Sequence, residues 1–395
     1  MHTQLKIQDY YLFLIWIFHS LLILLLSYIN PNHYTTVDSH YYLESASNLL
    51  SGKGYSIVEN NSCNWNSTFP IGYSMTISCA SFLTHTNVLI ASKLVNIAAS
   101  GIWLMYLKRR FGREKSVILS GILFLGCFLK LWAHTWSEPL FLVILFCWTF
   151  DFYLLNRHSQ ISKSTFCYLF FLGISLIAIR YAGIFIIPLT LVFCFKHFQR
   201  NNYIKAKVCA GLTFGWATFF ILYLLLNKYQ SVDFFGGERF DGNIQIIGNL
   251  ITFSKGLLNE VLISDTNFEV FSFLSLAGMA IQTFAIILYC SQNFQKIKNL
   301  SSLTIYFWII AAGYFFFLFT ARLFSPFDHP GYRLLAPFSF LVLSGFCLIL
   351  EFDQFSKRMK YASFTLIIFS WLDLIPRQNF NIKLQQVFSA ISDII

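Results

Sequence analysis

Charged residues are scarce in this chain, where they make up 12% of 395 residues, whereas apolar residues make up 56%. The mean hydropathy is correspondingly high, at +0.60. Soluble globular proteins carry about 25% charged residues, so this chain has too few charges to cover a soluble surface. The composition therefore excludes a soluble globular fold and predicts an integral membrane protein.

Paired cysteine motifs are also lacking. The nine cysteines form no CxxC pair, and most of them lie in or beside apolar segments. This pattern indicates neither a disulfide framework nor a metal cluster, although a bond between Cys63 and Cys79 stays open. Internal repeats, low-complexity tracts and a soluble second domain are absent from the sequence. We therefore expect residues 1–395 to form a single polytopic membrane domain.

Apolar segments long enough to cross about 30 Å of hydrocarbon recur along the chain, so we predict an all-α protein with about 11 transmembrane helices. The first segment lacks a small-residue cleavage site and is long for a signal peptide, so we expect it to stay as an anchor. The predicted spans are Tyr11–Ile29, Val88–Leu107, Val117–Trp132, Leu140–Leu155, Tyr168–Ile179, Gly183–Phe195, Val208–Leu226, Val270–Cys290, Leu303–Phe319, Leu334–Leu350 and Tyr361–Ile375.

The net charge of +10 reflects topology rather than a nucleic-acid partner, because the basic residues gather in short loops between spans. If the amino terminus is cytoplasmic, roughly 17 of the 28 basic residues fall on the cytoplasmic side. Besides Lys6, they lie in the loops Lys108–Lys115, Arg157–Lys163, Lys196–Lys207, Lys296–Lys298 and Lys357–Lys360.

Two long loops, residues 30–86 and 228–267, then face the non-cytoplasmic side. In the first of them, Phe69–Leu83 is apolar but short, which favours an interfacial or re-entrant helix. The second carries Asp233 and several glycines that indicate turns, and it either covers a site or is simply solvated. The tail, residues 377–395, repeats apolar residues at near-helical spacing, so we predict an amphipathic segment on the membrane surface.

Asp38 is the first candidate for chemistry, since it lies in the polar stretch directly after the first span. A partly desolvated carboxylate there can take a proton from an acceptor hydroxyl. The alternative is a helix N-cap ahead of Tyr41–Leu50, with Gly52 closing that helix. The two roles are compatible, because a cap also holds the carboxylate in place.

Glu138 follows Trp136-Ser137 where the third predicted span ends, on the same side as Asp38. It is a candidate to bind a metal, a sugar hydroxyl or a cation, or it is a first-turn acid favoured by the helix dipole. His134 adds a second possible ligand, but one His and one Glu are a weak metal signal. The sequence leaves a divalent cation open but does not support one, and it firmly implies no cofactor.

Several cations lie on the less positive side of the predicted topology. Arg180 and Arg333 stand at span boundaries, and a guanidinium suits phosphate, so a lipid-phosphate site is plausible. Snorkelling, or structural pairs with Glu138 or Asp328, is the alternative, and it is favoured for Arg322. Lys93 and Lys130 either contact an anionic headgroup or snorkel, with snorkelling favoured.

Six short stretches, taken in order, resemble the GT-C membrane glycosyltransferases, and most closely their protein O-mannosyltransferase and aminoarabinose transferase branch. The stretches are Asp38-Ser39-His40-Tyr41-Tyr42, Asn48-Leu49-Leu50-Ser51-Gly52-Lys53-Gly54-Tyr55, Pro70-Ile71-Gly72-Tyr73, Ser137-Glu138-Pro139-Leu140-Phe141, Arg180-Tyr181-Ala182-Gly183 and Arg333-Leu334-Leu335-Ala336-Pro337.

The resemblance implies an inverting glycosyltransferase that moves a sugar from a polyprenyl-phosphate carrier to an acceptor hydroxyl on the non-cytoplasmic face. It implies Asp38 as the general base, and a lipid, glycan or protein as the acceptor. Bacterial-type plasma membrane is the location that it suggests. By the same resemblance the substrate and donor site would be lined by Tyr41, Tyr42, Lys53, Tyr73, Glu138, Arg180, Tyr181 and Arg333.

Two departures from the branch pattern bear on the chemistry. Ser39 follows Asp38 where the branch often has Glu, which weakens a metal role. Ser67 and Thr68 stand where it often has a basic residue, so the phosphate charge must be met elsewhere, for example by Lys53, Arg180 or Arg333. A secondary transporter or a flippase of lipid-linked glycans is the alternative function, but it predicts charges at the bilayer midplane and two related halves.

Overall fold

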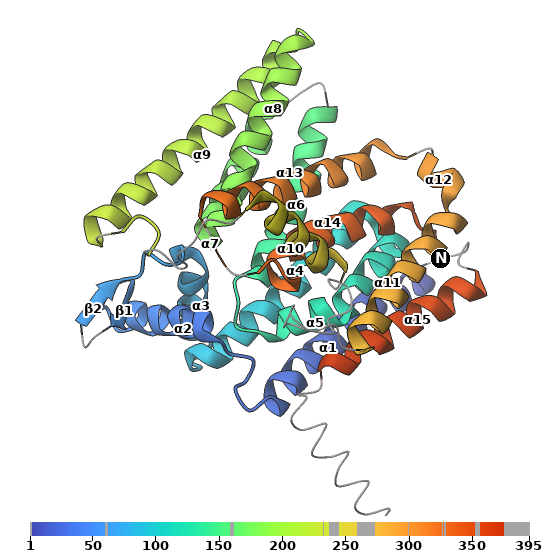
Figure 1. The fold of residues 1–395 in the computed structure, drawn as a ribbon, viewed down its shortest axis with the longest axis horizontal. Helices are drawn as coiled ribbons and strands as arrows, with labels where there is room; N and C mark the ends of the chain where they lie inside the picture. The colour runs from blue at the N-terminus through green and yellow to red at the C-terminus, as the bar shows by residue number, and fades with distance from the viewer. Residues whose placement is uncertain are drawn as a thin grey trace, which may run out of the picture.

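The fold is almost entirely helical in the computed structural model, which describes residues 2–59, 62–158, 162–231, 233–236, 245–258, 273–298, 300–325, 327, 329–351 and 356–374 (Figure 1). The elements in chain order are α1 His2–Ile29, α2 Val37–Leu50, β1 Ser56–Glu59, β2 Ser62–Trp65, α3 Ile71–Thr84, α4 Val88–Ser120, η1 Gly121–Phe124, α5 Gly126–Ala133, α6 Glu138–Arg157, α7 Lys163–Ile179, η2 Tyr181–Phe185, α8 Ile186–Gln199, α9 Tyr203–Gln230, α10 Ile246–Leu258, α11 Phe273–Gln292, α12 Phe294–Lys298, α13 Ser302–Phe324, α14 Tyr332–Ile349, α15 Lys357–Trp371 and η4 Leu372–Leu374.

Seven of the described helices are long and apolar enough to cross a membrane, which confirms the all-α membrane class. These are Tyr10–Ile29, Val88–Phe124, Glu138–Arg157, Tyr181–Gln199, Tyr203–Gln230, Ser302–Phe324 and Tyr332–Ile349, and three shorter apolar helices are Lys163–Ile179, Ile246–Leu258 and Ala277–Gln292. The predicted number of about 11 spans is not confirmed by this set.

The span predicted at Val117–Trp132 is wrong as a single helix. This window covers the end of α4, η1 and α5, and Leu125 between them has extended backbone angles. Upstream, Gly112 has φ 72° and ψ −174°, which interrupts α4 at a conformation that glycine adopts easily. Hydropathy detects the apolar run but not these breaks. The second predicted loop also contains α10, an apolar helix that we did not predict.

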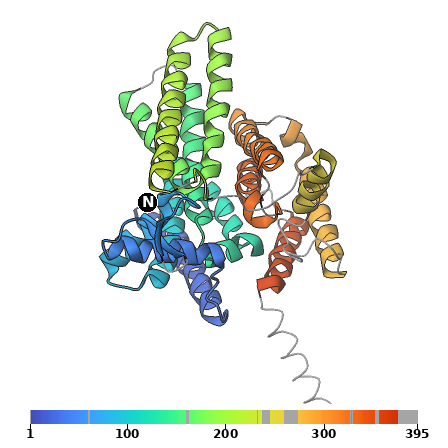
Figure 2. The same cartoon turned by 60° about the vertical axis from the view of Figure 1, so that its left-hand side comes forward.

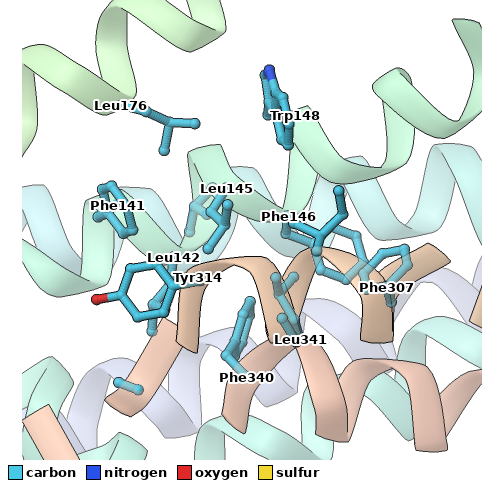
Figure 3. Close-up of a cluster of buried hydrophobic side chains, with 14 of the residues drawn as sticks. Phe141, Leu142, Leu145, Phe146, Trp148, Leu176, Phe307, Tyr314, Phe340 and Leu341 are labelled. Carbon is cyan, nitrogen blue, oxygen red and sulfur yellow. The ribbon is translucent and has the colours of Figure 1, made fainter. Parts of the chain in front are cut away.

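The core is centred on α6, whose side chains are buried along nearly its whole length. Phe141, Leu145 and Phe146 of this helix face α13 and α14, which contribute Tyr314, Phe307, Phe340 and Leu341 (Figure 3). The Phe146 ring lies edge-on to that of Phe307, with 5.1 Å between centroids. Since lipid tails are as apolar as these side chains, close packing rather than solvent exclusion favours the association of such helices.

The first long loop is folded and attached to the helix bundle. It contains α2, the β1–β2 hairpin, in which Ser56 pairs with Trp65, and α3 (Figure 1). A small core that includes Tyr42 and Tyr73 joins α2 to α3 and α4. Asn227 of α9 accepts a hydrogen bond from Trp65 Nε1 at 3.0 Å. Figure 2 shows α8 and α9 rising side by side away from this region.

The helix α3 has 14 residues and would be about 21 Å long, too short to cross the hydrocarbon layer. Its length agrees with an interfacial or re-entrant helix, and its depth in the membrane stays a prediction. The predicted amphipathic tail, residues 377–395, lies outside the described residues.

Gly72 explains one of the sequence motifs in physical terms. A Cβ at this position would lie 2.6 Å from Ala178 O, so only glycine lets α3 approach the end of α7 this closely. Two residues further, Arg180 caps α7. Gly183 makes a similar close approach on the other side of Arg180, where a Cβ would meet Leu176 O at 2.4 Å. These two close approaches fix the turn that carries Arg180.

We expect Gly72→Ala to lower the free energy of unfolding by about 1–3 kcal/mol, because backbone must move to admit the methyl group. Thermal unfolding in detergent measures the effect. Gly248→Ala in α10 is the matched control, since a Cβ there meets nothing within 4 Å and alanine favours a helix over glycine. Equal unfolding temperatures for Gly72→Ala and the wild type would contradict the packing argument.

Candidate functional site

Asp38 lies in the first turn of α2, but it is not the N-cap. Thr36 holds the N-cap position, and its backbone N–H donates to Ser39 Oγ at 3.0 Å. The helix therefore begins at Val37, four residues before the predicted Tyr41. Because Thr36 and Ser39 satisfy the helix end, the Asp38 carboxylate is available for another partner, and it accepts a hydrogen bond from Arg333 Nη1 at 2.5 Å.

Glu138 is the first residue of α6, and its side chain is fully buried. Its Oε1 accepts a hydrogen bond from Arg333 Nε at 2.5 Å and forms an ion pair with Arg180 Nη1 at 2.7 Å. Its Oε2 is buried without a hydrogen-bond partner in the structure. The acid thus lies at the positive end of the helix dipole, as the first-turn alternative expected, and contacts two cations as well.

Arg333 connects the two carboxylates, and Arg180 completes the set. Asp38, Glu138, Arg180 and Arg333, called the ion cluster below, come from α2, α6, the end of α7 and α14. Two negative and two positive formal charges balance within it. The side chains of Asp38 and Arg333 are 30% and 23% exposed, so the edge of the cluster that they form is open to a ligand.

Arg180 and Arg333 therefore both pair with Glu138, as the ion-pair alternative predicted. Asp328, the other proposed partner, lies outside the described residues. The phosphate role of both arginines stays a prediction. Such a role is compatible with these pairs, since a guanidinium has donors on more than one edge.

Two predicted tyrosines are buried beside the cluster. The Tyr42 hydroxyl shares a hydrogen bond with Ser137 Oγ at 3.1 Å, and the rings of Tyr42 and Tyr73 lie edge to face, 5.0 Å apart. Burial, followed by the charge of Glu138, raises the pKa of Tyr42, and burial followed by Tyr42 and Glu138 raises that of Tyr73. Both phenols therefore stay protonated and offer a neutral hydroxyl next to Glu138.

The other predicted binding residues lie around the cluster or away from it. The Tyr41 ring is 6.1 Å from that of Phe69. The Tyr181 hydroxyl donates to Ser67 O at 2.8 Å and accepts from Asn227 Nδ2, so it ties η2 to the first loop and α9. Lys53 is exposed in the turn after α2 and is not part of the ion cluster.

The remaining cations have separate surroundings. Lys93 is buried and donates to Ala133 O at 2.6 Å, so the snorkelling alternative is wrong for this lysine. Lys130 lies 5.4 Å from the centroid of Tyr332. Arg322 is buried and donates to Asn249 Oδ1 at 2.9 Å, which ties α13 to α10. Arg322 is thus a structural cation rather than a member of the ion cluster.

Metal ligation was the other possibility for this region. Within the part of the chain that the structure describes, no group of three or more His, Cys, Asp or Glu side chains could hold a metal ion. His134 stacks on Trp136 instead, and Cys63 and Cys79 are both free.

His134 makes the folded protein sensitive to acid. Burial, followed by the positive charges of Lys130, Lys93 and Arg333, holds the pKa of His134 well below its usual range. In the unfolded chain, histidine takes up a proton below about pH 6.5. Since the unfolded state binds more protons there, the free energy of unfolding falls as the pH drops below this value, by up to about 1.4 kcal/mol per pH unit.

We therefore expect His134→Phe, which keeps an aromatic ring on Trp136, to lose less stability than the wild type between about pH 7 and about pH 5. Thermal unfolding across this range measures the difference. Parallel pH profiles for the two proteins would show that His134 is not the group responsible.

Trp136 and Ser137 contact the predicted site residues but are not among those that we predicted. The Arg333 Cζ lies 4.3 Å from the Trp136 ring centroid. Both residues directly precede Glu138 in the same motif, and this adjacency was the available signal. Trp136 contacts an arginine almost 200 positions away and Ser137 contacts Tyr42, which is 95 positions away, and the sequence does not bring these residues together.

Comparison with known proteins gives the fold. No family model and no curated protein matches the chain. The ArnT of Cupriavidus metallidurans bound to undecaprenyl phosphate matches with a TM-score of 0.54 at 14% identity, over 91% of this chain and 62% of that one. Its apo state gives a TM-score of 0.51 at 16% identity, over 82% of this chain and 56% of ArnT.

A third structure is the Archaeoglobus fulgidus oligosaccharyltransferase tethered with an acceptor peptide containing the NVT sequon. It matches with a TM-score of 0.51 at 14% identity, over 92% of this chain and 55% of that one. The chain thus spans between 55% and 62% of the length of these proteins. At such identities the likeness shows the fold alone, and it confirms that this chain shares the fold of these membrane proteins, as the resemblance of its motifs predicted.

Proposed function

We propose that this protein is an inverting glycosyltransferase, which moves a sugar from a polyprenyl-phosphate carrier to an acceptor hydroxyl with Asp38 as the general base. One observation carries the proposal: the partly exposed Asp38 carboxylate lies 2.5 Å from Arg333, in a cluster with a second arginine. A base is thus held next to cations suited to phosphate. The undecaprenyl phosphate bound to ArnT supports such a donor.

The proposed reaction exchanges one bond for another. Asp38 takes the proton of the acceptor hydroxyl as that oxygen attacks the anomeric carbon from the face opposite the leaving group. The bond from this carbon to the phosphate oxygen breaks, and the electron pair leaves with the lipid phosphate. Arg333 and Arg180 stabilise the charge that develops on the departing phosphate.

The charge balance of the ion cluster bears on this mechanism. Two acids already neutralise the two arginines, so a donor phosphate would share the guanidinium donors with Asp38 and Glu138. Since a guanidinium has donors on more than one edge, Arg333 can contact the phosphate while it stays between the two carboxylates.

The reaction is proposed for the non-cytoplasmic face. Glu138 begins α6 at the ion cluster, and α6 has 20 residues, or about 30 Å. Toward its other end, Asp151 pairs with Arg110, and Asn156 O accepts from Lys205. The basic loops therefore gather one membrane thickness away from the cluster. Basic loops favour the cytoplasmic side, which supports the proposal that the cluster faces the non-cytoplasmic side of a bacterial-type plasma membrane.

A transfer assay with the purified chain tests this proposal. Polyprenyl phosphates carrying different labelled sugars are offered with lipid, glycan and peptide acceptors, since the acceptor class is open. We expect label to move to one acceptor class, with one free polyprenyl phosphate released per sugar. Movement of the intact lipid-linked sugar across proteoliposome membranes without transfer would overturn the proposal in favour of a flippase.

A further inference from the structure

We infer that Trp136 is a positioning residue that holds the Arg333 guanidinium between the two carboxylates and fixes its distance to the helix carrying Asp38. This inference rests on the proposed function, because it concerns the same arginine. It adds a residue to which the proposed reaction assigns no role. Trp136 itself contacts none of the reacting atoms.

Three side chains form a continuous stack. The rings of His134 and Trp136 are parallel within 2°, with 3.6 Å between centroids, and the Arg333 Cζ lies 4.3 Å from the centroid of Trp136. A cation over an indole face is attracted by the ring quadrupole. Stacking also fixes the plane of a planar guanidinium. In that plane, Nε and Nη1 point to Glu138 and Asp38, respectively.

The indole also connects Arg333 to α2. Trp136 Nε1 donates to Thr36 Oγ1 at 2.9 Å, and Thr36 is the N-cap of the helix in which Asp38 occupies the first turn. The residue that supports the cation is thus bonded to the residue that starts the helix of the base. Movement of Trp136 would change the separation of Arg333 and Asp38.

The turn that carries Trp136 is held rigidly by α4. Lys93 Nζ donates to Ala133 O and to Thr135 Oγ1, at 2.6 and 3.0 Å. Asn96 Nδ2 donates to His134 O at 2.8 Å and to Trp132 O as well. These buried bonds satisfy backbone carbonyls at the end of α5 and in the turn before α6, which lie beyond the regular hydrogen bonds of a helix. Trp136 is itself only 5% exposed, which suits a fixed support rather than a mobile ligand contact.

The test compares Trp136→Leu, which removes the ring, with Trp136→Phe, which keeps a ring face and loses the N–H. Two quantities are measured for each: the turnover number, and the dissociation constant of polyprenyl phosphate without sugar. We expect Trp136→Leu to lower turnover about 10- to 100-fold, as a misplacement of about 1 Å can do. It should weaken carrier binding about 10-fold. Trp136→Phe keeps the ring face and should stay within about threefold of the wild type in carrier binding. The lost bond to Thr36 should lower its turnover about three- to tenfold.

Trp216→Leu is the matched control, since this buried indole donates to Phe170 O at 2.9 Å on α9 and α7, outside the ion cluster. We expect it to lower the unfolding temperature but leave turnover and carrier binding per folded molecule unchanged. Equal losses in Trp216→Leu and Trp136→Leu would overturn the positioning role. If Trp136→Leu does not fold, a folded Trp136→Phe with the turnover of the wild type overturns it too.

Different experimental results would refute this inference and the proposed function. A wild-type protein that binds carrier and transfers sugar, with an equally active Trp136→Leu, refutes only the role of Trp136. A wild-type protein that neither binds carrier nor transfers sugar refutes the proposed function, and the role of Trp136 falls with it.

Discussion

Replacing Asp38 by asparagine is expected to lower turnover by about 10²–10⁴-fold, the usual contribution of a general base. Asparagine has the same size as aspartate, and its amide oxygen still accepts a hydrogen bond from Arg333. It cannot take a proton from the acceptor. Folding and carrier binding should therefore change little, because both depend on the geometry of α2 and on the arginines.

Initial rates with saturating donor and acceptor measure this loss. Asp151→Asn is the matched control, since Asp151 also pairs with an arginine and accepts from Tyr106 Oη, but toward the opposite end of α6. We expect it to retain turnover. Full sugar transfer by Asp38→Asn would remove Asp38 from the chemistry, and solute uptake that survives the substitution would support a transporter.

Replacing Glu138 by glutamine is expected to reduce the free energy of unfolding by about 3–5 kcal/mol. The carboxylate is fully buried and pairs with both arginines, of which Arg180 is only 12% exposed. Glutamine keeps the size of the side chain but leaves two cations facing one remaining acid, Asp38. An unpaired charge in such surroundings has lost water without gaining a partner.

Thermal unfolding in detergent measures the effect, and a second substitution separates charge from shape. Adding Arg180→Gln to Glu138→Gln should recover part of the lost unfolding temperature, because Arg333 then keeps Asp38 and no cation is left unpaired. A double variant less stable than either single variant would contradict the charge argument. Glu138→Gln should also destabilise more than Asp151→Asn, since the partner Arg110 is 41% exposed.

Local signals predicted much of the fold. Apolar length identified each helix that the structure shows as a candidate span, since a bilayer imposes a minimum run on any crossing helix. The same signal failed at Val117–Trp132, where the chain breaks between α4 and α5 within one apolar run. It also missed α10, whose residues lie in what reads as a loop.

The sequence by itself determined the membrane class, the fold that its motifs resemble, and the four charged residues of the ion cluster, because hydropathy and short motifs are properties of neighbouring positions. Only the tertiary structure decided how those charges pair. Asp38 and Arg333 are 295 positions apart, and their contact depends on how α2 packs on α3 and α4 and how α14 packs on α6. The support that Trp136 gives to Arg333 has the same origin, since ring and guanidinium meet only after the helices have associated.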